Sequence, residues 1–420
     1  MATILRRLRP LRARLILLLA VVGPGIITAN VDNDAGGITT YSVAGAHFGY
    51  SLLWMLALVA LALIIVQEMS ARLGIVTGKG LADLIRESFG VRATAWIIGV
   101  VVIANLANTV SEFAGVAASM EIFGVSKYVS VPLVALGVWL LIVKGNYKFV
   151  ERIFLVASAI YFAYVLSGFM ANPPWGTVLQ AVHTPTFHFE IGYVTIFVTI
   201  IGTTIAPWMQ FYQQASIVDK GLKVDELGYE RIDVIVGSLF AVLVAAFITI
   251  ACAATLFANG IRIETAQDAA LALGPLAGEY AEALFALGLL NASVFSAAIL
   301  PLSTAYVVCE AFGWEMGVSH NWKDAPVFFG VYTALIVLGA AIILLPIRSL
   351  VETMLASQTL NGVLLPIILI TMLKLINDER LMGKFVNGRV FNAIAWALVI
   401  ALIALTAILV VTSVSPGVFR

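Results

Sequence analysis

Charged residues are scarce in this sequence of 420 residues: they make up 11% of it, whereas a soluble domain carries roughly 25%. Hydrophobic residues make up 61%, and the mean hydropathy is +1.02. A soluble fold of this length has too little interior to bury so much apolar surface. The chain is therefore an integral membrane protein.

Cysteine and net charge are lacking as well. The two cysteines, Cys252 and Cys309, lie in apolar stretches without the spacing of a metal site. This pattern excludes a disulfide framework and a zinc site. The 24 basic and 24 acidic residues cancel, so we expect the lipid bilayer, and no nucleic acid, as the surroundings of this chain.

Apolar runs of about 20 residues, the length that crosses a bilayer as a helix, recur along the chain. They do not alternate with a period of two, as the strands of a membrane barrel would. We predict an all-α protein with about eleven transmembrane helices, forming a single transport domain over residues 1–420. The predicted spans are 15–46, 50–71, 93–120, 128–144, 153–170, 193–218, 232–258, 281–312, 326–346, 349–373 and 391–414.

Basic residues are distributed unevenly between the segments that connect these spans. With the N-terminus in the cytoplasm, 20 of the 24 lysines and arginines fall on the cytoplasmic side, and the exceptions are Lys127, Arg262, Arg348 and Arg420. The positive-inside rule therefore predicts a cytoplasmic N-terminus and an external C-terminus. The compact chain is typical of a multi-pass protein of the bacterial inner membrane, and we expect it to function as a monomer.

Two of the predicted spans are interrupted by polar or helix-weakening residues, at 28–42 and at 201–214. The second break holds Pro207, which removes a backbone donor. The second break lies five spans after the first. Because five is odd, the two interrupted helices cross the membrane in opposite directions. This pattern predicts an inverted repeat of five plus five helices in which helices 1 and 6 unwind at the midplane. We expect repeat one at about 15–170, repeat two at about 193–373 and an additional helix at about 391–414.

The first break carries two carboxylates, Asp32 and Asp34, inside an otherwise apolar span. A charged side chain at mid-membrane is costly and normally faces a cavity or an ion. Carboxylates beside freed backbone carbonyls form an oxygen-rich negative pocket, which suits a hard cation. Asp34 is the main candidate. Asp32 and Val31 are secondary candidates, and we expect Asp32 to attract cations in an outer vestibule.

Several motifs resemble the Nramp family of divalent-metal transporters, which share the LeuT-type fold. GPGIITANVDNDAGGITTYSVAGAHFGYSLLW, at 23–54, is similar to the family's first two helices. ARLGIVTGKGLADLIRE (71–87) is similar to the loop after helix two, and SEFAG (111–115) to the helix-three signature. The resemblance extends over spans one to ten. It implies a transporter that works by alternating access, with no enzymatic activity and no cofactor.

The chain departs from the family's metal-binding motif in helix one. The family has Asp-Pro-Gly-Asn where this chain has Asp-Ala-Gly-Gly at 34–37. The resemblance implies that the metal-binding aspartate survives as Asp34, whereas Gly37 replaces the metal-binding asparagine.

A second departure lies in helix six, where the family's Met-Pro-His is Ala-Pro-Trp at 206–208. Ala206 replaces the methionine whose sulfur helps to select manganese and iron, and Thr203 replaces an alanine that offers its carbonyl. Loss of the thioether favours magnesium, and the smaller side chains at Gly37 and Ala206 leave room for an ion that keeps its waters. The chain resembles the Nramp-related magnesium transporters, and we expect Mg²⁺, and also Mn²⁺, as a largely hydrated cargo. A manganese transporter in which these positions have drifted is the alternative.

The positions that carry protons in the family are also changed. The acidic residue and the aspartate of helix three correspond to Val102 and Thr109, and the histidine after the helix-six proline to Trp208. None of these can relay a proton near neutral pH. We therefore predict transport without proton coupling. Glu112 remains of that set, and the sequence leaves open whether it lines the cavity or packs as a protonated side chain.

Further candidates and rival functions remain. Gln358 and Asn361 either contact the water shell of an ion or form interhelical hydrogen bonds. An ordinary proton-coupled Mn²⁺/Fe²⁺ transporter, a sodium-coupled amino-acid carrier and a channel are alternatives, although Asp34 would repel an amino-acid carboxylate. No catalytic constellation of an intramembrane enzyme is present within the spans.

Overall fold

The computed structural model describes residues 33–144, 158–188, 190–318 and 320–414. These residues form helices and connecting segments without a strand. Among them, nine helical segments are long and apolar enough to span a membrane. The predicted first and fifth spans are described only in part, and the all-α membrane fold is confirmed.

The described part of the first half of the bundle begins with α3. It contains α3 (Ala35–Phe48), α4 (Leu53–Thr77), α5 (Leu81–Ile122), α6 (Lys127–Lys144) and α8 (Phe162–Met170). The second half contains α10 (Ile191–Thr204), α11 (Pro207–Lys220), α12 (Leu227–Thr255), α15 (Ala281–Phe312), α16 (Pro326–Leu344) and α17 (Leu350–Ile376). The predicted additional helix is α19 (Arg389–Val414), which follows the short α18 (Glu379–Met382).

Besides α18, several segments outside the predicted spans are helical. α5 begins at Leu81 and not at 93, and it consists of two helical pieces that meet at a kink at Gly90, whose φ of 77° is not helical. Only Gly lacks the Cβ that makes this conformation costly. α9 (Trp175–His183) lies in the segment expected to be a polar loop, and the short α13 (Ala266–Ala270) and α14 (Gly274–Ala277) lie in the other. All of these segments are too short or too polar to be found by a search for apolar runs of about 20 residues.

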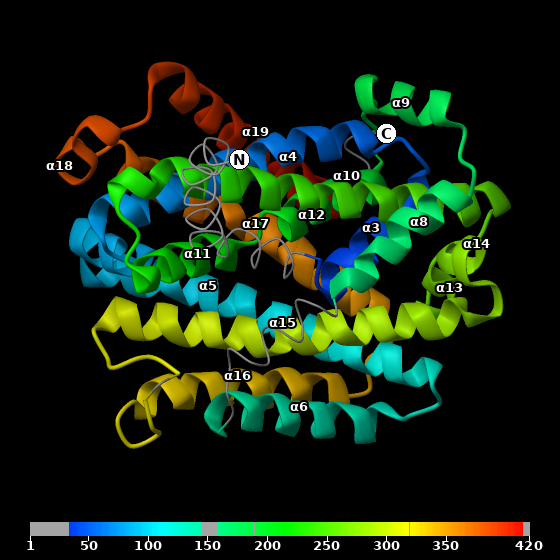
Figure 1. Ribbon diagram of the computed structural model, residues 1–420, viewed down its shortest axis with the longest axis horizontal. Coiled ribbons are helices and arrows are strands. Elements are labelled where there is room, and N and C mark those ends of the chain that lie inside the picture. Colours follow the sequence, from blue (N-terminus) through cyan, green and yellow to red (C-terminus); the bar gives the residue numbers. More distant parts are fainter. Residues whose placement is uncertain (1–32, 145–157, 189, 319, 415–420) are drawn as a thin grey trace, which may run out of the picture.

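Helices that occupy corresponding places in the two halves pack against each other. α4 packs on α12, α5 on α15 and α6 on α16 (Figure 1). α17 runs through the interior, in contact with α3, α5 and α10. This arrangement places the beginning of α3 and the junction of α10 with α11 around the middle of α17.

Candidate metal site at two helix breaks

The first break ends where Asp34 caps the N-terminus of α3. The Asp34 Oδ1 atom accepts a hydrogen bond of 2.7 Å from the backbone N–H of Gly37. A carboxylate here satisfies a free donor of the first turn and faces the positive end of the helix dipole. Asp34 is only 5% exposed. Gly37, predicted as a site residue, therefore contributes an N–H that orients the carboxylate and no side-chain ligand.

A second carboxylate, that of Glu112 on α5, lies against the same helix end. Its Oε2 atom accepts a hydrogen bond of 3.3 Å from the backbone N–H of Ala35, and its carboxyl group interacts with that of Asp34. The Oε1 atom is buried and has no hydrogen-bond partner among the described residues. Gly115, one turn further along α5, lets the two helices approach closely, because a methyl group there would collide with Ala35.

The proximity of Asp34 and Glu112 has an electrostatic consequence. Two ionised carboxylates that are removed from water repel each other strongly unless a cation or a proton compensates them. Within the part of the chain that the structure describes, no cluster of three or more His, Cys, Asp or Glu side chains is present. The pair thus offers a divalent cation two charges and leaves the remaining coordination to backbone oxygens or water.

The second break separates α10 from α11. α10 ends at Thr204 and α11 begins at Pro207, with Ala206 as an extended N-cap. Because proline has no N–H, Pro207 leaves the carbonyl of Thr203 without its helical donor. The Thr203 hydroxyl is also buried without a hydrogen-bond partner among the described residues. The break therefore presents oxygen atoms at the negative end of the α10 dipole, which favours a cation.

Gln358 of α17 brings the two breaks together. A methyl group at Gly36 would collide with the Gln358 side-chain amide, and one at Gly202 would collide with the Gln358 carbonyl oxygen. The first turn of α3 and the last turn of α10 thus both lie directly against this residue. Gln358 Oε1 accepts a hydrogen bond of 2.8 Å from Asn361, while its Nε2 atom is buried without a partner among the described residues.

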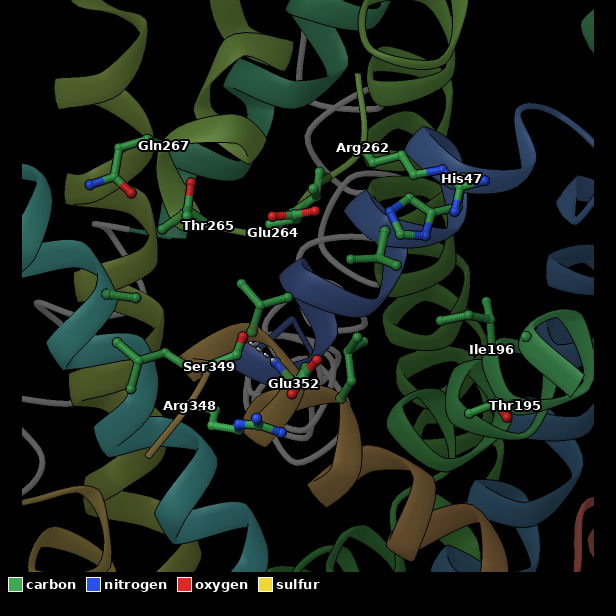
Figure 2. Close-up of a pocket in the computed structure, with 18 of the residues that line it drawn as sticks. His47, Thr195, Ile196, Arg262, Glu264, Thr265, Gln267, Arg348, Ser349 and Glu352 are labelled. Carbon is green, nitrogen blue, oxygen red and sulfur yellow. Dashed lines mark hydrogen bonds between the residues drawn. The ribbon is translucent and has the colours of Figure 1, made fainter. Parts of the chain in front are cut away.

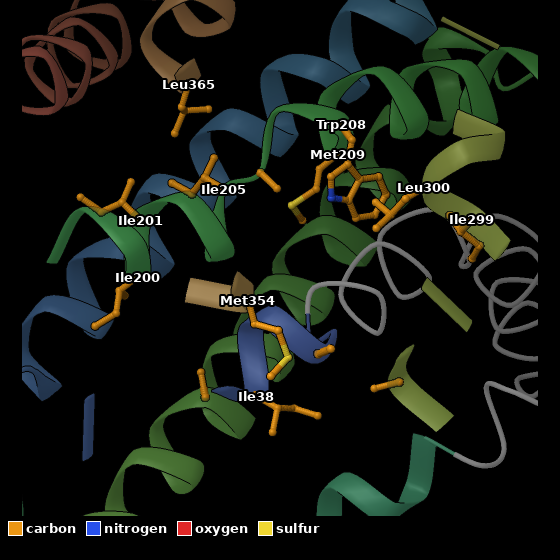
Figure 3. Close-up of a cluster of buried hydrophobic side chains, with 14 of the residues drawn as sticks. Ile38, Ile200, Ile201, Ile205, Trp208, Met209, Ile299, Leu300, Met354 and Leu365 are labelled. Atoms are coloured by element: carbon orange, nitrogen blue, oxygen red, sulfur yellow. The ribbon is translucent and has the colours of Figure 1, made fainter. Parts of the chain in front are cut away.

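The surroundings of the second break are apolar. Trp208 lies beside Leu300 and Met209, and Ile205 lies close by on the same side of the bundle (Figure 3). Ala206 brings no sulfur to the break. Two methionines nevertheless place sulfur in this region. Met209 follows Pro207 by two residues, and the Sδ atom of Met354 accepts a hydrogen bond of 3.4 Å from Thr39 Oγ1. Sequence reasoning missed Met354, since a methionine in an apolar helix gives no signal of its own.

An amide network that the sequence did not reveal joins α5 to α17. Asn108 Oδ1 accepts hydrogen bonds from Asn361 Nδ2 at 2.7 Å and from Ser357 Oγ at 3.0 Å. One turn earlier, Asn105 Nδ2 donates to Thr304 Oγ1 of α15 at 2.8 Å. Asn361 therefore forms an interhelical hydrogen bond, which is one of the two roles predicted for it. Two asparagines spaced three residues apart in an apolar helix, Asn105 and Asn108, are the sequence signal of this network.

None of the three positions that replace the family's proton carriers holds an ionisable side chain. The Thr109 hydroxyl donates to the carbonyl of Asn105 at 2.7 Å within its own helix, and the Thr109 methyl group lies close to Gly339 of α16. Val102 is half-buried and Trp208 is fully buried. Val31 and Asp32 lie outside the described residues.

A cavity of about 1190 Å³ opens at the end of the bundle where α3 ends and α17 begins. Figure 2 shows His47, Arg262 and Glu264 on one side of it and Arg348 and Glu352 on the other. Its acidic residues are Glu121, Glu190, Glu264 and Glu352, and its basic residues are Lys127, Arg262 and Arg348. The lining does not include Asp34, Thr203 or Ala206, each of which is at most 5% exposed. The candidate site is thus closed off from this vestibule.

A helical bundle in which one helix begins at a pair of buried carboxylates and another is interrupted close by has the architecture of a secondary transporter. Residues 25–412 match the family model described as natural resistance-associated macrophage protein-like, Nramp. The chain belongs to the Nramp family, and it is a transporter and not an enzyme.

Curated relatives extend over nearly the whole chain. A divalent metal cation transporter MntH of Ralstonia nicotianae is 30% identical over 403 residues, which cover 91% of this chain and 88% of the relative. A protein of the same name from Bacillus subtilis is 26% identical over 407 residues, which cover 94% and 92%.

Solved structures share the fold. The manganese transporter of Eremococcus coleocola, in complex with an aromatic bis-isothiourea substituted compound, has a TM-score of 0.78 at 23% identity and covers 95% of this chain and 88% of that one. A nucleobase-cation-symport-1 family transporter, in a closed conformation with bromovinylhydantoin bound, has a TM-score of 0.60 at 15% identity, with 93% and 89% covered. The expected LeuT-type fold is confirmed.

Proposed function

We propose that this chain transports divalent metal cations across the membrane, with Mg²⁺ as the preferred cargo and Mn²⁺ as a second one. The observation that carries the proposal is the buried pair of Asp34 and Glu112 at the α3 N-terminus. Two carboxylates balance the charge of one divalent ion, and an amino-acid carboxylate would be repelled there. The names of the MntH relatives support the metal class.

The preference for Mg²⁺ rests on the ligand types at the two breaks. Carboxylate, carbonyl and water oxygens suit Mg²⁺ and Mn²⁺, whereas a thioether favours softer metals. Ala206 supplies no sulfur and Gly37 no amide oxygen, so water has to complete the shell of the ion. Because the site residues are closely packed in the described conformation, a largely hydrated ion requires the helices around the breaks to move apart, as alternating access demands.

We further propose that transport is not coupled to protons. Val102, Thr109 and Trp208 offer no proton carrier, so the membrane potential drives the ion at about 2.3 kcal/mol per charge per 100 mV. With the N-terminus in the cytoplasm and the C-terminus outside, the vestibule of Figure 2 faces the exterior.

Proteoliposomes containing the full chain test the function. We expect Mg²⁺ and Mn²⁺ uptake that depends on an inside-negative potential, and no uptake of amino acids. Amino-acid uptake without metal uptake would refute metal transport. Mn²⁺ uptake without Mg²⁺ uptake would refute the preference only.

A proton-coupled Mn²⁺/Fe²⁺ transporter of the ordinary Nramp type is the second candidate. It is favoured by the Glu112 carboxyl group, which can hold a proton beside Asp34 when no metal is bound. A pH-sensitive dye inside the liposomes separates the two candidates. We expect no acidification during metal uptake, and acidification driven by the metal would establish coupling.

A further inference from the structure

A second cavity, of about 500 Å³, lies at the end of the bundle opposite the vestibule. It is formed by α4, α12 and the segment that leads from α18 into α19. In Figure 1, α18 lies at the other end of the long axis from α9, α13 and α14. With the predicted orientation, this cavity faces the cytoplasmic leaflet of the membrane.

The charged groups of this cavity are mainly basic. Arg72, Arg231 and Lys384 line it, together with a single acid, Glu68. Glu68 pairs with Arg72 at 3.0 Å and with Arg231 at 2.8 Å. One carboxylate neutralises one of the two guanidinium charges, and Lys384 adds another positive charge. The lining therefore carries an excess of two positive charges.

Donors remain in the cavity after these bonds are counted. Arg72 Nε is buried without a hydrogen-bond partner among the described residues. Arg231 bonds to Glu68 through Nε and Nη2, which leaves N–H groups of its Nη1 atom, and its side chain is 49% exposed. Lys384 lies with its Nζ atom 5.4 Å from the Phe385 ring centroid and keeps its N–H donors. A guanidinium fork and an ammonium group together suit a phosphate.

The remaining wall of the cavity is apolar and continues onto exposed apolar surface. Ile64, Val234, Ile235 and Phe391 line it. About one helical turn further from the arginines, Leu61 of α4 and Leu239 of α12 are exposed. These two helices pack against each other, so an apolar strip leads from the basic cavity toward the middle of the membrane. A soluble phosphate makes no use of such a strip, whereas an acyl chain does.

We propose that this cavity binds an anionic phospholipid of the cytoplasmic leaflet. The phosphate contacts Arg231 and Lys384, while the buried guanidinium of Arg72 adds positive charge behind them, and the acyl chains lie along α4 and α12. The bound lipid would hold the α18–α19 segment against the ends of α4 and α12, since Arg72 also donates to the Phe385 carbonyl at 2.7 Å. Basic pockets between helices on the cytoplasmic side are suited to anionic headgroups.

Native mass spectrometry of the purified full-length chain in detergent tests the proposal. Phosphatidylglycerol and phosphatidylcholine with the same acyl chains are added in turn. We expect a retained adduct with phosphatidylglycerol and little with phosphatidylcholine. In the double variant Arg231→Gln/Lys384→Gln, the affinity for phosphatidylglycerol should fall roughly thirty-fold, because each basic group contributes roughly fivefold.

The control is Lys323→Gln, which removes an exposed lysine outside the cavity lining and should leave binding unchanged. Lys384→Gln alone keeps the Glu68 ion pairs intact, and it should weaken binding about fivefold even if the double variant fails to fold. Equal binding of both lipids, or unchanged affinity in Lys384→Gln, would overturn the proposal. Displacement of the lipid by the same concentration of glycerol phosphate would instead identify a site for soluble phosphate.

Discussion

The two helix breaks differ in chemistry although they occupy corresponding places in the two halves. The first carries the charge: Asp34 caps α3 and Glu112 lies against the same turn. The second has no charged side chain, and its polar groups include the Thr203 and Thr204 hydroxyls and the Thr203 carbonyl, which Pro207 cannot bond. Under the proposed function, the first break provides the charge that attracts a cation, and the second provides the remaining ligands. In this chain position 206 of the second break is an alanine and supplies no sulfur.

The largest effect should follow from removing the charge of the first break. Asp34→Ala leaves one carboxylate where a divalent ion needs two, and it removes the cap of α3. We expect metal uptake into proteoliposomes to fall to the level of empty vesicles. Asp324→Ala, which removes an exposed aspartate, should transport as the unchanged chain does. Wild-type flux in Asp34→Ala would end the assignment of the site.

Glu112→Gln should have the next largest effect. Glutamine keeps an acceptor for the Ala35 N–H but removes a buried charge beside Asp34. Divalent uptake at low concentration should fall at least roughly tenfold, because a nearby charge contributes several kcal/mol at low effective dielectric. Glu282→Gln, at an exposed position of α15, is the matched control. If uptake persists unchanged in Glu112→Gln, this side chain is a protonated packing partner and the first break holds only one charge.

The close contact of Gln358 with both breaks can be tested by measuring the stability of variants in which a glycine at each break is replaced. Gly36→Ala and Gly202→Ala should each lower the free energy of unfolding by about 1–3 kcal/mol, the usual cost of overpacking. Gln358→Ala should relieve Gly36→Ala, whose new methyl group meets the glutamine side chain. It should not relieve Gly202→Ala, whose methyl group meets the backbone carbonyl. Thermal unfolding of the single and double variants measures this, and equal rescue of both would contradict the packing described.

The sequence predicted the elements that depend on local pattern. The apolar run at 281–312 coincides with α15, and the polar interruption at 28–42 contains the start of α3 at Ala35. The helical start of α5 at Leu81 was missed, because its charged face breaks the apolar run. The prediction was thus reliable where a single helix buries apolar surface throughout.

Contacts between distant segments could not be derived in the same way. Gln358 and Asn361 were noticed as polar residues, but their partners lie far away in the sequence. The Asn361 amide binds Asn108 of α5, whereas Gln358 lies against both breaks. A pattern along one helix does not specify which helix it faces. Similarly, the approach of Glu112 to the N-terminus of α3 depends on how α5 packs, since Gly115 permits the contact.

The smallest of the expected changes isolates the missing sulfur of the second break. Isothermal titration of Mg²⁺ and of Mn²⁺ into the purified chain and into Ala206→Met compares the two metals at the same site. We expect the unchanged chain to bind Mg²⁺, and the methionine to shift the ratio of affinities toward Mn²⁺ by roughly tenfold. A chain that binds only Mn²⁺, or a ratio that the methionine leaves unchanged, would contradict the link between the ligands at the second break and the choice of metal.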